Sequence, residues 1–571
     1  MRRRASVVSY NILAPSLGSN TIPWVTALPR ELSESVDAAL GVAPVEGATT
    51  WETLLKRVIT PEYRAHFHKN WMVLPDGLND SVPMRKVWAQ CDVGHHMDPL
   101  LRPKLRAVAP DTVEYTDVRT GARSQATTLR GLLRASLPTG LGERVFNAII
   151  EDESRLYSWK ARGPAIVDRL IGVATGGSWE DRPDILLLQE YDRETETLAA
   201  FSLPPTRSDS PGVARDAGTA VPDISMRAAL VRHGYGGVVF NNPVGAPSVA
   251  VYWRRDRWAC AATEDDVLVL NCGESATGAA FCVDLMSSSH SQLAPAAAAG
   301  DADAAPLRRH AERELLPLRD RRCAGFVKLE PRASGGGGGG GADTASIWAC
   351  TAHLMTSSRD NCAKNRFPGE VRIGELGVVC EKAAELVPPG DALLIGGDFN
   401  LDPSFLWQCA ASGITPREVG GAAALDGAAL ATPAALDASD AADGTRELAL
   451  RWSGTELREA FEVQHAWRED ACARWPTSIN AKRSTRIDQL WFTPSTLARV
   501  RAAPSEGAGG SAAAAAAAAV ERIGRTPTAP IPCLSADGAR IAEPSDHVPI
   551  AALFELRGGR ATSSSSEASA L

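Results

Sequence analysis

The chain has 571 residues, of which 44% are hydrophobic and 22% are charged, as in ordinary globular proteins. With 60 Lys and Arg residues against 68 Asp and Glu residues, its formal net charge is -8, so charge alone is a poor basis for holding nucleic acid. No apolar run approaches the ~20 residues that span a bilayer, and the N-terminus lacks the apolar segment of a signal peptide. The 11 cysteines include no Cys-x-x-Cys pair, which indicates reduced thiols. We therefore expect a cytoplasmic or nuclear protein with no membrane partner.

Short apolar runs separated by polar turns predict a series of buried strands. The first covers residues 6–14, and the others cover 184–189, 237–240, 248–253, 325–329, 346–354, 392–396, 487–492 and 549–554. Helical periodicity appears after Pro164, which suits the first turn of a helix, and again over 371–386. Strands that alternate with helices predict an α/β layered domain.

Six of these apolar runs carry polar side chains suited to chemistry within them or next to one of their ends. They are Asn11, Glu190, His353, the pair Asp398 and Asn400, Asp488, and the pair Asp546 and His547. In open α/β sheets, ligands bind beyond strand ends. Carboxylates and amides at such ends can hold Mg²⁺, a hard ion that takes oxygen ligands, and a histidine beside an aspartate can serve as an acid, a base or a phosphate donor.

Each of these residues alone also has a purely structural interpretation. Asn11 is typical of a turn after a strand, and Asp398-Phe-Asn400 is typical of a turn with side-chain caps. Glu190 fits a solvated strand end, and His353 fits a core histidine with satisfied hydrogen bonds. Asp546-His547 fits a helix cap. Only their joint occurrence, in this order along the chain, favours a single site.

The ordered set resembles the endonuclease/exonuclease/phosphatase superfamily, and its wording is closest to the carbon-catabolite-repressor-type deadenylase, nocturnin and angel branch. The motifs that carry this resemblance are Ser-Tyr-Asn11-Ile-Leu-Ala, Leu156-x-x-Trp159-x-x-Arg162, Gln-Glu190, Ala250-Val-Tyr-Trp-Arg254, His353-Leu, Gly397-Asp398-Phe-Asn400, Ile-Asp488 and Ser-Asp546-His547. The resemblance implies a four-layer α/β sandwich with two packed mixed β-sheets flanked by helices, plus large insertions.

Composition along the chain, together with the resemblance, predicts a division of the chain. Residues 1–16 would supply the first strand of the catalytic domain, 17–152 an insertion subdomain, 153–557 the rest of the catalytic domain with low-complexity loops near 335–341, 420–443 and 505–520, and 558–571 a disordered tail.

The roles of the site residues also follow from the resemblance. Glu190 would be the main ligand of Mg²⁺ (or Mn²⁺), with Asn11 beside it and Asp546 completing the metal region. Asp398 would activate or orient the attacking water and touch the metal. Asn400 would hold the scissile phosphate, His353 would donate to the phosphate, and His547, oriented by Asp488, would contact a phosphate oxygen.

The function implied is a Mg²⁺-dependent phosphodiesterase, most simply a 3′–5′ exoribonuclease that degrades single-stranded RNA to 5′-nucleotides. Two alternatives stay open: a phosphatase acting on a small phosphorylated molecule such as a dinucleotide, and a non-catalytic binding module. Poly(A)-specific members carry an aromatic residue shortly before the Ile-Asp motif, whereas this chain has Arg483 in that stretch, which weakens the prediction of adenine specificity. Arg483 would stack on a base, bind a phosphate or face solvent. No protein partner is indicated.

Two further features favour structural interpretations. Cys91, His95 and His96 lack a second pair of zinc ligands, so a loop is the favoured interpretation. The mixed-charge segment 308–322 is typical of a solvated face.

Overall fold

The computed structural model describes residues 3–14, 28–43, 49–58, 105–109, 112–116, 123–127, 129–152, 159–171, 182–191, 225–241, 248–263, 266–285, 322–332, 345–354, 367–401, 445–446, 449–452, 455–459, 463–464, 477–480, 483–500, 533–534, 540–541 and 545–557. The predicted low-complexity loops and disordered tail lie outside the described residues, as do Cys91, His95 and His96.

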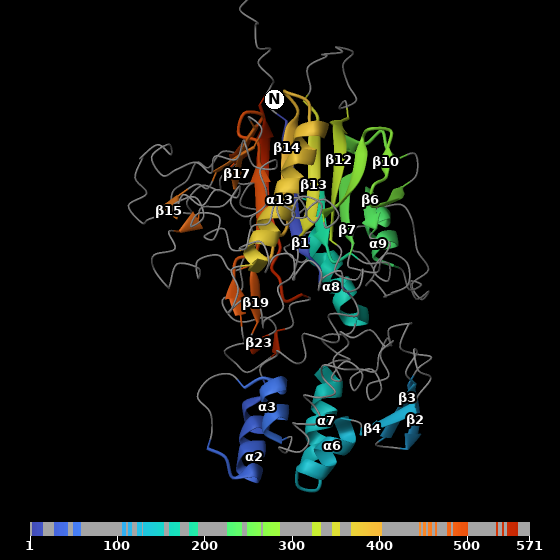
Figure 1. Ribbon diagram of the computed structural model, residues 1–571, viewed down its shortest axis with the longest axis vertical. Helices are drawn as coiled ribbons and strands as arrows, with labels where there is room; N and C mark the ends of the chain where they lie inside the picture. The colour runs from blue at the N-terminus through green and yellow to red at the C-terminus, as the bar shows by residue number, and fades with distance from the viewer. Residues whose placement is uncertain are drawn as a thin grey trace, which may run out of the picture.

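Two mixed β-sheets form the centre of the molecule (Figure 1). The seven-stranded sheet has the order β22 (Leu497–Val500), β25 (Ile550–Leu556), β1 (Arg4–Asn11), β5 (Ile185–Gln189), β7 (Val249–Arg254), β6 (Tyr235–Asn241) and β9 (Val267–Asn271). The nine-stranded sheet has the order β10 (Ser275–Ala276), β11 (Ala280–Asp284), β12 (Cys323–Pro331), β13 (Ile347–His353), β14 (Ala392–Asp398), β21 (Asp488–Phe492), β17 (Thr455–Glu459) and β16 (Ala449–Trp452), with β8 (Trp258–Ala259) also paired to β12.

Three hydrophobic clusters define four layers. The largest lies between the sheets and joins side chains such as Leu187 of β5 and Phe240 of β6 to Leu394 of β14. A second cluster packs α8 (Trp159–Ile171) and α9 (Met226–Arg232) on the outer face of the seven-stranded sheet. A third packs α13 (Phe367–Leu386) on the outer face of the other sheet. The fold is therefore the predicted four-layer α/β sandwich.

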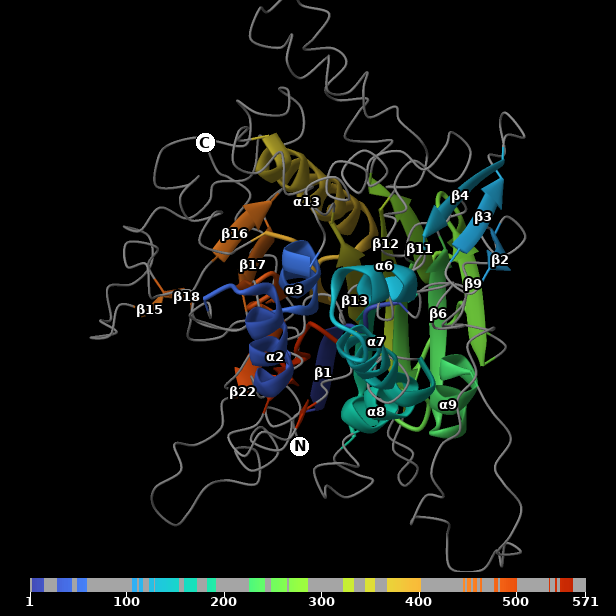
Figure 2. The same cartoon turned by 90° about the horizontal axis from the view of Figure 1, so that it is seen from below.

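The part of the chain predicted as an insertion contains elements of its own. They are α2 (Arg30–Leu40), α3 (Trp51–Val58), β2 (Leu105–Ala109), β3 (Thr112–Thr116), β4 (Arg123–Thr127), α6 (Leu129–Ser136) and α7 (Leu141–Asp152). These elements lie beyond the end of the sandwich toward which β1 runs, as the two views show (Figures 1 and 2). The predicted boundaries of the subdomain stay a prediction.

Three small two-stranded sheets complete the described elements. They are β15 (Thr445–Arg446) with β18 (Val463–Gln464), β19 (Ser478–Asn480) with β20 (Arg483–Thr485), and β23 (Cys533–Leu534) with β24 (Arg540–Ile541). No helix in the described ranges is both long enough and apolar enough to cross a membrane.

Strand direction gathers the polar strand ends at one edge of the sandwich. β1 and β5 pair in parallel, with Asn11 opposite Gln189, and β13 and β14 pair in parallel, with His353 opposite Asp398. β21 runs antiparallel to β14 and begins with Asp488 opposite Asp398. Because parallel strands end at the same edge, residues hundreds of positions apart in sequence become neighbours.

The predicted strands all coincide with observed ones, but the helix near Pro164 begins earlier than predicted. Pro164 lies inside α8, which starts at Trp159. A proline inside a helix removes one backbone hydrogen bond. The turn before it is fixed instead by side chains, because the guanidinium of Arg162 stacks on the Trp159 ring, 5.5 Å from its centroid, and donates to backbone carbonyls of the chain after β1.

Gly325 of β12 marks a place where the sheets approach closely. A Cβ atom there would lie 2.0 Å from Cδ2 of Phe240, which is fully buried. We expect Gly325→Ala to lower the free energy of unfolding by about 1–3 kcal/mol, because the ring has to shift within a packed core. At about 2–4 °C per kcal/mol for a domain of this size, the melting temperature would fall measurably in a thermal scan.

Gly278→Asn provides the matched control in the neighbouring hairpin. Gly278 has a φ of +69° and nothing within 4 Å of a built Cβ atom, and asparagine tolerates this backbone conformation. Its melting temperature should stay within a degree or two of the wild type. An equal loss in both variants would contradict the packing argument.

Candidate active site

Asn11, the last residue of β1, is the hub of the polar cluster. Its Nδ2 donates to Oδ2 of Asp398 at 2.9 Å and to Oε1 of Glu190 at 3.2 Å. Its Oδ1 accepts from the backbone N–H of Leu13 at 2.9 Å. Asn11 is fully buried, so one amide holds two carboxylates from different sheets side by side.

The turn after Asn11 is held by Arg162, the last residue of the Leu156-x-x-Trp159-x-x-Arg162 motif. Nη2 of Arg162 donates to the carbonyl of Ile12 at 3.0 Å and also to that of Leu13. Leu13 has a φ of +52°, a left-handed conformation that costs a non-glycine residue of order 1–3 kcal/mol. The backbone N–H of Ala14 then donates to Oε2 of Glu190 at 3.1 Å. The strained turn therefore places a backbone N–H donor on the carboxylate of Glu190.

Glu190 follows β5 directly and also has a left-handed backbone, with a φ of +56°. The next residue fixes this turn, because the N–H of Tyr191 donates to the carbonyl of Ser248 at 2.9 Å. The Tyr191 hydroxyl lies 2.8 Å from that of Tyr252 on β7. Burial raises the pKa of Glu190, and the charges of His547 and Arg322 oppose that shift.

Asp398 and Asn400 sit where β14 ends. Oδ1 of Asp398 accepts from the N–H of Asn400 at 2.8 Å, and Asn400 has a φ of +48°. Nδ2 of Asn400 donates to the carbonyl of Leu354 at 3.0 Å. Gly397 leaves no room for a side chain, because a Cβ atom there would lie 1.9 Å from the carbonyl oxygen of Ala352. The glycine explains how the strand reaches this turn without a clash.

His547 and Asp488 form a buried ion pair beside Asp398. Nδ1 of His547 lies 2.8 Å from Oδ2 of Asp488, and its Nε2 lies 3.7 Å from Oδ2 of Asp398. Asp546 is close as well, with Oδ1 at 3.8 Å from the same Nε2. Burial lowers the pKa of His547, but the carboxylates of Asp488 and Asp398 outweigh it and raise the pKa to about 10. This imidazole is therefore protonated at neutral pH.

His353 has the opposite character. Its Nδ1 lies 3.3 Å from Nη1 of Arg322, and its Nε2 lies 3.6 Å from Oδ2 of Asp398 and 4.0 Å from Oε1 of Glu190. Burial and the charges of Arg322 and His547 hold the pKa of His353 well below its usual value. Because the guanidinium can only donate, Nδ1 accepts and the proton sits on Nε2, which faces the carboxylates.

The donor set fits a hard divalent cation. Glu190 and Asp398 are both buried and are joined by a single amide, and burial raises the pKa of each carboxyl group. A cation between them would offset their repulsion, and Mg²⁺ takes such oxygen ligands. Oδ1 of Asp488 is buried and accepts no hydrogen bond from any described residue. Asp398, Asp488 and His547 also place one ligand atom each within 4.8 Å of the others.

All eight residues singled out in the sequence come together at this edge of the sandwich. The structure adds residues that the sequence did not reveal. Arg322 is buried against His353, whereas the segment that ends with it was predicted to be a solvated face. Thr477 accepts from the N–H of Asp488 at 2.9 Å, and the Ser545 hydroxyl donates to the carbonyl of Asn11 at 2.8 Å. Ser545 belongs to the Ser-Asp546-His547 motif, but its contact with Asn11 was not predicted, and Thr477 has no signal in the sequence.

Comparison with known proteins identifies one family. The sequence profile of the Endonuclease/Exonuclease/phosphatase family matches residues 159–547, from the start of α8 to His547. No curated protein matches the chain.

Solved structures resemble this fold at low sequence identity. ANGEL2, described as a 2′,3′-cyclic phosphatase in complex with adenosine-2′,3′-vanadate, shares 14% identity over 72% of this chain and 92% of its own, with a TM-score of 0.34. The human Nocturnin catalytic domain with a bound sulfate shares 14% over 70% and 88%, with a TM-score of 0.30. D. rerio TDP2 with a single-stranded DNA product shares 12% over 70% and 93%, with a TM-score of 0.27.

Proposed function

The chain belongs to the endonuclease/exonuclease/phosphatase family, whose members are hydrolases, and from that premise we propose that it is a Mg²⁺-dependent phosphodiesterase acting on single-stranded RNA from the 3′ end. The observation that supports this proposal best is the Asn11 amide, which holds Glu190 and Asp398 together beside a protonated His547. The RNA substrate is supported by the sequence motifs, whose wording is closest to the deadenylase branch.

The residues present divide into cation ligands and phosphate donors. Glu190, Asn11 and Asp398 would hold the cation, with Asp546 beside them. When bound, Mg²⁺ would neutralise charge on the phosphate and lower the pKa of a bound water. A phosphodiester is an anion that repels an incoming hydroxide, so this neutralisation is what the acidic cluster contributes.

Asp398 has a second role, and the remaining residues would act on the phosphate. Asp398 would orient the water and accept its proton. Nε2 of His547, positively charged and held by Asp488, would donate to a phosphate oxygen as its negative charge grows. Nε2 of His353 would donate as a neutral group from the other side, and Asn400 would hold the scissile phosphate. The buried His547–Asp488 pair keeps this donor in place before the substrate arrives.

A paired-substrate assay tests the proposal. The same RNA sequence is supplied in linear form and as a covalently closed circle, with Mg²⁺ and with EDTA. We expect the linear RNA alone to be degraded, to nucleoside 5′-monophosphates, only when Mg²⁺ is present, because an exonuclease needs a free end. A variant with Asp391→Asn, at the other end of β14, serves as the active control.

Each other product pattern has a defined meaning. Equally fast cleavage of the circle would contradict exonuclease action and indicate an endonuclease. Release of inorganic phosphate from small phosphomonoesters, with no RNA shortening, would replace the proposal with a phosphatase. Degradation that continues in EDTA would contradict the cation requirement.

A further inference from the structure

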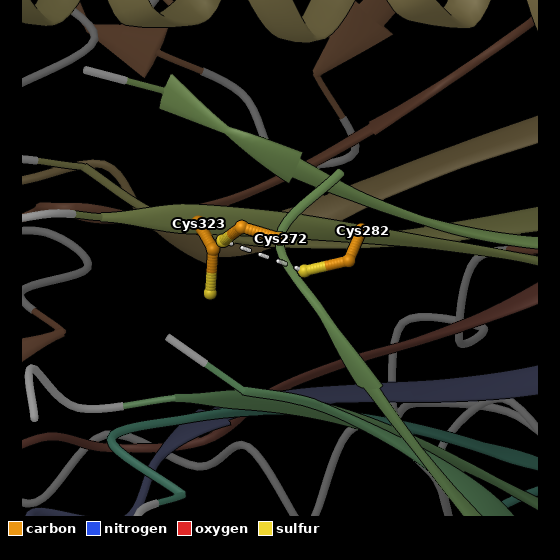
Figure 3. Close-up of side chains that lie close together, drawn as sticks. All are labelled: Cys272, Cys282 and Cys323. Atoms are coloured by element: carbon orange, nitrogen blue, oxygen red, sulfur yellow. Dashed lines mark hydrogen bonds between the residues drawn. The ribbon is translucent and has the colours of Figure 1, made fainter. Parts of the chain in front are cut away.

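Three cysteine thiols, two from neighbouring strands and one from the turn after a third strand, converge in a group that shares no residue with the carboxylate cluster (Figure 3). Cys272 follows β9 of the seven-stranded sheet, Cys282 lies in β11, and Cys323 opens β12 of the other sheet. Sγ of Cys272 and Sγ of Cys282 are 3.7 Å apart, and all three sulfur atoms lie within 4.8 Å of one another. Cys282 and Cys323 are buried and Cys272 is partly exposed. The cluster thus bridges the two sheets and has one member near solvent.

The backbone directs Cys272 toward the other two thiols. The N–H of Gly273 donates to the carbonyl of Cys282 at 2.9 Å, and the N–H of Cys282 donates to the carbonyl of Glu274 at 3.1 Å. Gly273 and Glu274 therefore both lie opposite Cys282, which is the pattern of a β-bulge. Gly273 has the positive φ, +86°, that this kind of bulge requires. Bulges change the direction of neighbouring side chains, so the convergence of the sulfur atoms depends on this local geometry.

We propose that Cys272, Cys282 and Cys323 form a binding site for one soft, thiophilic metal ion, with copper(I) favoured by the set of three sulfur ligands. Sulfur-only ligand sets select copper(I) and zinc. Three sulfur atoms bonded to one ion at about 2.3 Å each lie about 4 Å apart in a trigonal arrangement, and here one separation is 3.7 Å and the other two are within 4.8 Å. Zinc prefers a fourth ligand, and no fourth His, Cys, Asp or Glu among the described residues joins this group.

Binding would exchange protons for the ion. In the metal-free protein, hydrogen bonds between the thiols and burial hold the pKa of Cys282 and that of Cys323 above the usual value, so these groups are neutral. A bound ion deprotonates a thiol that coordinates it. As each sulfur–metal bond forms, an S–H bond breaks and the proton leaves to solvent, with no electron transferred. The apparent affinity should therefore rise with pH.

The site is separate from the carboxylate cluster yet adjacent to it. Cys323 directly follows Arg322, whose Nη1 lies 3.3 Å from Nδ1 of His353. Sγ of Cys323 also donates to the carbonyl of Phe240 at 3.6 Å. A test of copper binding must therefore report on the thiol site alone. Direct measurement of bound copper does this, because it does not depend on hydrolysis at the carboxylate cluster.

The test is an anaerobic titration of the reduced full-length protein with copper(I) against a coloured copper(I) chelator. We expect one tight equivalent of copper per chain, with an affinity that increases with pH. Cys272→Ser and Cys282→Ser should each weaken copper binding by at least about 10- to 100-fold, since losing a ligand costs no less than losing its supporting hydrogen bond. Cys380→Ser, in α13 and outside the cluster, should bind as the wild type does.

Two further variants keep the result interpretable. Cys272→Ser changes the partly exposed member, so it is expected to fold even where the buried Cys282→Ser does not, as circular dichroism will show. Asp398→Asn should still bind one copper ion per chain, because Asp398 belongs to the carboxylate site and is not one of the three sulfur ligands. Equal copper binding by the wild type and Cys272→Ser would overturn the proposal, as would displacement of copper(I) by an equal concentration of Zn²⁺. Either failure leaves the phosphodiesterase proposal untouched.

Discussion

Asp398→Asn is expected to lower kcat by about a hundredfold to a thousandfold on the RNA substrate, and also to raise the melting temperature of the metal-free protein. The loss of rate follows because the side chain would no longer accept the proton of the attacking water or neutralise a cation. The gain in stability follows because burial raises the pKa of Asp398, so its charged form is disfavoured beside Glu190. An asparagine removes the charge, and its single oxygen can still accept from Asn11, but the N–H of Asn400 then loses its acceptor, which offsets part of that gain.

Added Mg²⁺ distinguishes this interpretation from simple misfolding. The wild type should gain stability with Mg²⁺, by about 2.7 kcal/mol at a hundred times the dissociation constant, because the ion binds the folded state alone. Asp398→Asn should gain much less. Thermal scans with EDTA and with Mg²⁺ measure both effects. A wild-type rate in the variant, or an equal response to Mg²⁺, would contradict the assignment of Asp398.

Asp391→Asn is the matched control, since Asp391 precedes the same strand at its opposite end. Its carboxylate accepts from the N–H of Ser346 and from Nε1 of Trp348, both at 3.3 Å. The substitution should cost some stability through the lost hydrogen bond and leave kcat unchanged. The contrast between the two ends of β14 would locate the chemistry at the edge that carries Asn11.

Much of the fold was predictable because buried strands carry a strong local signal. The continuous apolar run before Glu190 and the one before Asp398 fix both the strands and the places where polar side chains follow them. That Glu190 and Asp398 lie close together was predictable only from the ordered set of motifs. Nothing in the sequence around Asn11 or Asp398 encodes the 2.9 Å hydrogen bond between them.

Contacts that depend on register were beyond the sequence. Arg322 sits in a segment of mixed charge, and only the antiparallel pairing of β12 with β13 brings it to His353. The three thiols show the same limit, because two lie in strands of one sheet and the third follows a strand of the other. The bulge that directs Cys272 depends on hydrogen bonds between Gly273 and a strand that follows in the chain. Composition indicated reduced thiols, and topology determined which of them meet.

The His547–Asp488 pair should behave as one unit in a double-mutant cycle. His547→Gln removes the charged donor to the phosphate and is expected to lower kcat by about a hundredfold or more. Asp488→Asn should cost nearly as much, because it leaves the imidazole without the carboxylate 2.8 Å away that orients and charges it. The double variant should be little worse than either single one, since residues that act together are strongly non-additive. Independent, multiplying losses would contradict this coupling.

The pH dependence of stability gives a second measurement of the same pair. The pKa of His547 is raised to about 10 in the folded protein, above the usual 6.5 of an unfolded chain. Between these values the folded state binds more protons, so this pair stabilises the fold fully below pH 6.5 and progressively less as pH rises toward 10. Denaturant titrations in EDTA at pH 6.5, 8 and 9.5 should show that decline in the wild type and a flatter profile in Asp488→Asn. His233→Gln, at a buried histidine that ends α9, should keep the wild-type slope between pH 8 and 9.5, because the pKa of this histidine is about 4 when folded and near 6.5 when unfolded, so it is neutral in both states there. A decline that persists in Asp488→Asn would show that the imidazole owes its charge to another group.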